Sequence, residues 1–135
     1  MIFKNTIPSF YSQDFKNQNV TITCAFTSIF FVASLVGILN HELWLDEAHH
    51  WLLGRDSTSF SNLLHNTRYE GHPLFWNILL FYITRITSNP FWMQFLHIIV
   101  STTTVIIFLK KAPFNWIFKG LFIFSYFMFF EYNII

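Results

Sequence analysis

Residues 44–73 read WLDEAHHWLLGRDSTSFSNLLHNTRYEGHP, and this stretch holds most of the polar chemistry of the chain. It contains two of the five tryptophans, four of the six histidines and four of the seven acidic residues. The sequence on either side of it is largely apolar. A polar loop between long apolar segments is typical of a membrane protein that displays a site at the bilayer surface.

The composition of the 135-residue chain supports a membrane location. It is 53% hydrophobic, 21% aromatic and only 11% charged, whereas soluble domains contain about 25% charged residues. Its 19 phenylalanines would be hard to bury in one small soluble core, and a bilayer supplies the apolar phase instead. The net charge of +1 provides no general attraction to nucleic acid, so no such partner is expected.

We therefore predict an all-α, multi-pass protein of the inner (plasma) membrane whose partner is the lipid bilayer. Residues 1–19 are predicted to form a cytoplasmic tail, and residues 41–72 an extracytoplasmic loop. About four transmembrane helices are expected, each in a segment with few charges: 20–39, 73–87, 91–109 and 116–135. A cleaved signal peptide fits less well, because the polar region before the first apolar segment is too long.

The outer loop is predicted to begin with an amphipathic juxtamembrane helix at residues 44–52. On a helical wheel, one face is apolar (Trp44, Leu45, Ala48, Trp51, Leu52) and the other polar (Asp46, Glu47, His49, His50). Asp46 and Glu47 lie four and three residues before His50, so these acids can contact its imidazole. Gly54 is expected to end the helix.

A second short amphipathic helix is predicted to follow, capped by Ser57 or Ser59. Its apolar face would comprise Phe60, Leu63, Leu64 and Thr67. Gly71 and Pro73 would stop this helix and redirect the chain into the next span. The pair of helices would return Arg68, Glu70 and His72 towards the face that carries Asp46.

Two other interpretations of the loop stay open. A divalent metal is a candidate cofactor, held between His72 and either His49 or His50, because mixed acid and imidazole ligands suit zinc. Alternatively, the polar residues are simply the solvated face of an interfacial helix. No metal ligand can be assigned from the sequence.

The motif Asp46-Glu47-Ala48, followed by Glu70-Gly71-His72-Pro73, resembles the GT-C superfamily of membrane glycosyltransferases. The similarity is to bacterial relatives of protein O-mannosyltransferases and of the lipid A aminoarabinose transferase, and it covers about residues 20–135. In that family an outer loop after the first membrane helix carries an Asp-Glu pair on a juxtamembrane helix, and a His-Pro pair opens the second membrane helix. Relatives often read His-Pro-Pro, where this chain has Leu74.

The resemblance implies transfer of a sugar from a polyprenyl-phosphate donor to an extracytoplasmic acceptor. By that resemblance Asp46 is the candidate general base and Glu47 a supporting acid. Arg68 and His72 would bind the donor phosphate. Candidates for acceptor or metal binding are His49, His50 and Glu70.

Family members are several times longer, so this chain is expected to be a truncated N-terminal part that is inactive alone. The alternative function is a non-catalytic membrane remnant or assembly subunit with an interfacial loop.

Segment 73–87 is short and contains Arg85, so it either spans, with Arg85 reaching the interface, or is re-entrant. Four crossings would place Lys110, Lys111 and Lys119 outside, against the positive-inside tendency. A re-entrant segment would return these lysines to the cytoplasm. The family resemblance favours four crossings.

Overall fold

The structure is a computed structural model that describes the backbone of residues 9–131 and 133 and the side chains of residues 19–130 and 133. The first part of the predicted tail, and residues 132, 134 and 135 of the predicted fourth span, lie outside the described residues. The described part of the chain is helical and contains no strand, as expected. Its helices are α1 (Ser9–Leu39), α2 (Leu45–Asp56), α3 (Phe60–Asn66), α4 (Leu74–Thr84), α5 (Phe91–Lys111), α6 (Trp116–Ile123) and a π-helical turn, η1 (Tyr126–Glu131).

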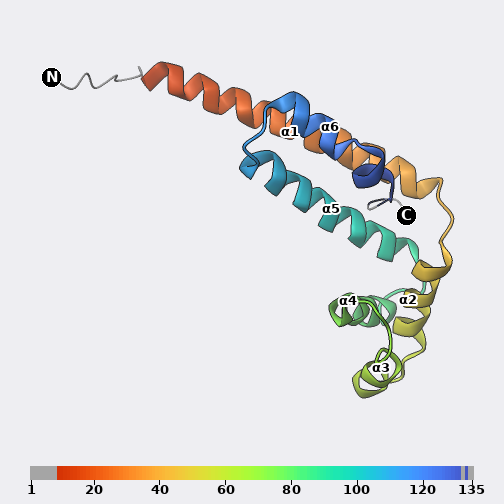
Figure 1. The fold of residues 1–135 in the computed structure, drawn as a ribbon. Coiled ribbons are helices and arrows are strands. Elements are labelled where there is room, and N and C mark those ends of the chain that lie inside the picture. The colour runs from red at the N-terminus through yellow and green to blue at the C-terminus, as the bar shows by residue number, and fades with distance from the viewer. Residues whose placement is uncertain (1–8, 132, 134–135) are drawn as a thin grey trace.

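Two helices are long and apolar enough to cross a membrane: Asn19–Leu39 within α1, and α5. Each has 21 residues, which corresponds to about 30 Å of helix, the thickness of a bilayer core. The two lie side by side in opposite directions (Figure 1). Large apolar side chains remain exposed on both, including Ile29, Val32 and Val36 on α1 and Ile99, Val100 and Ile107 on α5.

The other two predicted spans are shorter in the described residues. Helix α4 has 11 residues, about half the length that a bilayer requires. Helix α6 has eight residues and ends at a turn before η1. Helix α1 begins at Ser9, so it extends into the region predicted as a tail.

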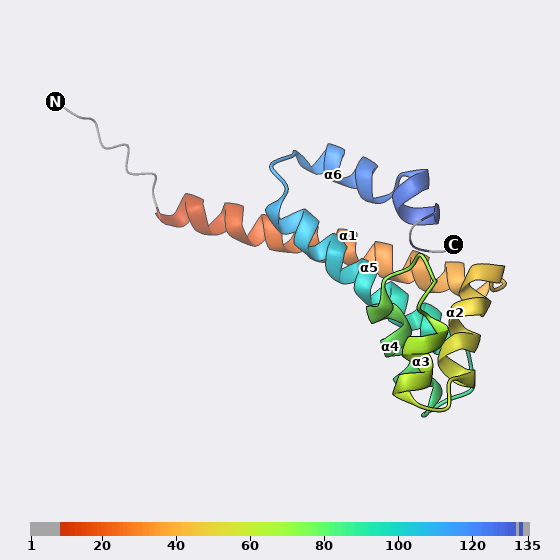
Figure 2. The same cartoon turned by 60° about the horizontal axis from the view of Figure 1, so that its bottom comes forward.

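Helix α6 packs on the α1–α5 pair. Phe30, Val105, Leu109 and Ile123 form the buried apolar cluster that joins the three helices. Farther along, the Asn133 amide donates a hydrogen bond of 2.7 Å to the Ser34 hydroxyl. Helix α6 and Asn133 therefore both contact α1, and Figure 2 shows α6 beside the α1–α5 pair.

Helices α2, α3 and α4, here called the cap, gather at one end of the α1–α5 pair (Figure 1). A second apolar cluster centres on Trp51, Leu80 and Met93 and joins α2 to α4 and to the start of α5. The buried face of α2 comprises His50, Trp51 and Gly54. Leu45 is 84% exposed, so the predicted apolar face of this helix is only partly the buried one.

Gly54 was predicted to end the first loop helix, and this prediction is wrong, because α2 continues to Asp56. Gly54 instead lies where α2 and α4 are closest. A Cβ atom added there would lie 3.0 Å from the backbone carbonyl carbon of Leu80. The absence of a side chain at this position therefore allows the two helices to touch.

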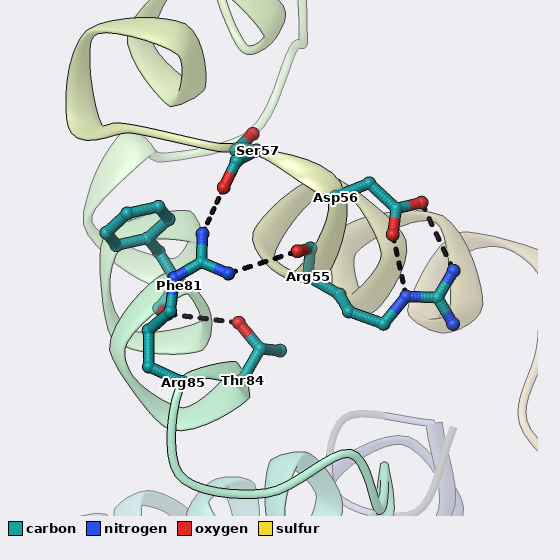
Figure 3. Close-up of polar contacts among 6 residues, drawn as sticks. All are labelled: Arg55, Asp56, Ser57, Phe81, Thr84 and Arg85. Atoms are coloured by element: carbon teal, nitrogen blue, oxygen red, sulfur yellow. Dashed lines mark hydrogen bonds and ion pairs between the residues drawn. The ribbon is translucent and has the colours of Figure 1, made fainter.

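Arg85 fastens the end of α4 to the end of α2 (Figure 3). Its guanidinium donates hydrogen bonds to the backbone carbonyls of Arg55, at 3.2 Å, and of Ser57. The same group lies 4.3 Å from the centroid of the Phe81 ring. These are contacts within the cap, so Arg85 caps the carbonyl end of α2, where cations are favoured.

Candidate functional site

A cluster of polar side chains joins α2 to the turn before α4. His49 Nε2 lies 3.0 Å from Glu70 Oε1, and His50 Nδ1 lies 2.9 Å from Asn77 Oδ1. The His72 ring packs edge-on against the His50 ring, with a centroid distance of 4.5 Å. We call these five residues the histidine cluster. It unites positions that are more than 20 residues apart in the sequence.

His50 lies inside the protein, although the helical wheel grouped it with the solvated residues. It is 6% exposed, and its partner Asn77 is fully buried. Because the Asn77 oxygen can only accept, His50 Nδ1 carries the proton in this pair. The Asn77 amide nitrogen is also buried and has no hydrogen-bond partner, so the side chain is satisfied through its oxygen alone, by His50.

The contact between His49 and Glu70 changes the acidity of the Glu70 carboxyl group. The hydrogen bond from His49 lowers the pKa of Glu70 below its ordinary value of 4.5, and the charges of His49, His50 and His72 act in the same direction. Glu70 is therefore ionised at neutral pH and accepts a hydrogen bond from His49.

The lowered pKa predicts a pH-dependent contribution to stability. A depressed carboxyl pKa stabilises the fold fully above the unfolded value, and the effect is lost as pH falls through the folded value. Wild type should therefore melt at a higher temperature than Glu70→Gln at pH 7, and the difference should shrink as the pH falls below the ordinary Glu70 value of 4.5. Thermal melts of the detergent-purified chain would measure this, with the exposed Glu42→Gln as control. A difference that persisted undiminished at the acidic end would contradict the assignment.

The two candidate catalytic acids have different surroundings. Asp46 is exposed on the first turn of α2, and helix periodicity places it on the same face as His50. Glu47 accepts a hydrogen bond from the backbone N–H of Trp44 at 3.0 Å, and its carboxylate lies 3.5 Å from His41 Nε2. Glu47 thus caps the start of α2.

The two candidate phosphate ligands, His72 and Arg68, make different contacts. His72 belongs to the histidine cluster. Arg68 is exposed after α3, with its guanidinium over the ring of Tyr69 at 5.4 Å from the centroid. Both remain accessible to a ligand that approaches the cap from solvent.

No group of three or more histidine, cysteine or acidic side chains is placed to hold a metal ion in the part of the chain that the structure describes. The histidine cluster uses its polar atoms in pairs instead. The proposed clip between His72 and His49 or His50 therefore has no third ligand in place among these residues.

The structural roles of two residues in the cap were not predicted from the sequence. Asn77 supplies the buried partner of His50, and Arg85 binds the end of α2. The sequence did contain a signal that Asn77 has a structural role, because it is the one amide within the apolar run LFWNILLFYIT of α4. Buried amides of this kind require a hydrogen-bond partner.

Comparisons with protein-family models, with curated proteins and with solved structures gave no match for this chain. The interpretation of the site therefore depends on its own geometry.

Proposed function

We propose that α1 and α5 cross the membrane as a hairpin that holds the cap on the extracytoplasmic side. The pairing of α2 with α4 from His50 to the end of α2 supports this arrangement. His50 meets Asn77, Gly54 meets Leu80, and Arg85 binds the end of α2. If α4 crossed the bilayer, α2 would enter with it.

Helix α2 is poorly suited to the interior of a bilayer. It carries Asp46, Glu47, Arg55 and Asp56 within 12 residues. Charged side chains inside a bilayer cost several kcal/mol each unless they pair or reach water. A cap that stays outside, with α4 as part of it, avoids this cost.

The distribution of basic residues also supports two crossings rather than four. With α4 outside, three arginines lie on the outer side: Arg55, Arg68 and Arg85. Five lysines then lie on the cytoplasmic side: Lys4, Lys16, Lys110, Lys111 and Lys119. This agrees with the positive-inside tendency, which four crossings would oppose.

The proposed activity is participation in sugar transfer from a polyprenyl-phosphate donor to an extracytoplasmic acceptor. The observation that carries it is the histidine cluster, which joins the helix of Asp46 to the turn that contains Glu70 and His72. Exposed Asp46 would accept the proton of the acceptor hydroxyl. His72 and Arg68 would bind the donor phosphate, whose negative charge needs donors or cations nearby.

Photo-crosslinking of the donor would test this proposal. With the chain in phospholipid nanodiscs, a polyprenyl-phosphate sugar bearing a diazirine on the sugar should label residues 44–73. His72→Ala should weaken labelling by about tenfold or more, the usual consequence of losing a hydrogen bond to a charged group. His65→Ala is the matched control, because His65 is an exposed cap histidine outside the cluster. Equal labelling of the two variants, or no labelling of the cap, would contradict donor binding here.

A non-catalytic membrane module is the second candidate function. It is favoured by the structural contacts of the candidate residues, since Glu47 caps α2 and His50 binds a buried amide. In that case the cluster only holds the cap together. The photo-crosslinking experiment then shows no donor-dependent labelling.

A further inference from the structure

The end of the α1–α5 pair opposite the cap contains an open pocket of about 940 Å³. Asn19 and Thr23 from the start of the α1 span line one side, and Lys110 from the end of α5 another. Trp116 and Lys119 of α6 complete it. The pocket therefore lies where the apolar segments of two helices end together, which is the level of the lipid headgroups.

Lys119 is the unusual feature of this pocket. It is 7% exposed, its ammonium donates a hydrogen bond of 2.6 Å to the backbone carbonyl of Leu109, and it lies 4.6 Å from the Trp116 ring centroid. An ammonium has three donors, so these contacts leave it with further capacity. A buried charge of this kind is costly unless an opposite charge is near.

The described side chains supply no such charge. The acidic residues among them lie between Glu42 and Glu70, and the ion pairs they make are with His41, His49 and Arg55, in and next to the cap. Lys110 adds a second positive charge to the pocket wall. The site is thus positive and, within the described residues, uncompensated, which favours an anionic ligand.

An apolar groove of about 520 Å³ adjoins the pocket. Phe114 lines both, and the groove continues over Phe108, Phe118, Leu121 and Phe122. A ligand that fills both would have an anionic head and a hydrocarbon tail. Basic pockets between membrane helices on the cytoplasmic side bind lipids of this type.

We infer that the Lys110–Lys119 pocket binds the phosphate of an anionic phospholipid, with one acyl chain in the adjoining phenylalanine groove. The site is independent of the proposed sugar-transfer site, which lies at the other end of the hairpin. Trp116 and Phe114 would flank the headgroup as interfacial aromatic residues do.

Native mass spectrometry of the full chain in mild detergent would test the inference. Phosphatidylglycerol should be retained in preference to phosphatidylcholine with the same acyl chains. Lys110→Gln should weaken phosphatidylglycerol binding about fivefold, the effect of one lysine at an anionic lipid surface. Lys119→Gln should have a larger effect, with helicity measured to confirm that the variant folds.

Lys111→Gln is the matched control, because Lys111 is the exposed neighbour of Lys110 and does not line the pocket. Equal losses in Lys110→Gln and Lys111→Gln would show general surface attraction and overturn the site. Equal retention of the two lipids would overturn the anionic headgroup. Displacement of phosphatidylglycerol by millimolar inorganic phosphate would overturn the lipid in favour of a free anion.

Discussion

Gly54→Val should separate α2 from α4 and be among the most destabilising single substitutions in the cap. The nearest atoms to an added Cβ are backbone atoms of Leu80 and Phe81, at 3.0 and 3.1 Å. Backbone cannot rotate away as a flexible side chain would, so the helices must move apart. Overpacking of this kind typically costs about 1–3 kcal/mol, and here it would also strain the contacts of His50 and Arg85 with the opposite helix.

Hydrogen exchange of the detergent-purified chain would measure this effect, with faster exchange expected in α2 and α4 and little change in α1 and α5. Gly71→Val is the control, because an added Cβ at Gly71 meets no atom within 4 Å. Gly71 also has a negative φ, as do all the glycines described. Similar exchange in the two variants would show that the close approach at Gly54 does not hold the cap together.

The second large effect is expected from His50→Phe. This change fills a similar volume but leaves the fully buried amide of Asn77 without its hydrogen-bond partner. Leaving a buried polar group unsatisfied costs about 1–3 kcal/mol. The melting temperature of the cap should fall accordingly.

The double variant His50→Phe/Asn77→Leu should recover most of that loss, because replacing both partners with apolar groups removes the unsatisfied amide. A double-mutant cycle over the two positions would measure the coupling. Additive losses in the two single variants would show that the pair contributes no specific interaction to the cap.

The sequence predicted the local elements of the cap well. The separation of residues 44–52 into a polar and an apolar face predicted a helix. Ser59, one of the two predicted caps, caps α3 by accepting a hydrogen bond from the backbone N–H of Asn62. These features depend on neighbouring residues only. The approach of Glu70 and His72 to the face of α2 was also expected, since Gly71 and Pro73 reverse the chain there.

The features that the sequence did not reveal depend on tertiary contacts. The burial of His50 follows from Asn77, 27 residues later, and no helical wheel of α2 contains that partner. Glycine is common at helix ends, yet Gly54 lies within α2, where its lack of a side chain allows the close contact with Leu80. Arg85 reads as a residue that reaches the interface from a span, and its guanidinium instead binds the carbonyl end of α2.

Cysteine accessibility at Ser88 tests the central claim most directly, because this residue lies between α4 and α5. In a Cys24→Ala background, single cysteines would replace Ser61, Ser88 and Lys111, all of which are exposed. If α4 stays with the cap outside the membrane, Ser61→Cys and Ser88→Cys should both react with an impermeant maleimide in intact cells, and Lys111→Cys only after permeabilisation. Labelling of Ser61→Cys and Lys111→Cys in intact cells, with Ser88→Cys silent until lysis, would show that α4 crosses the bilayer and would contradict the two-helix hairpin.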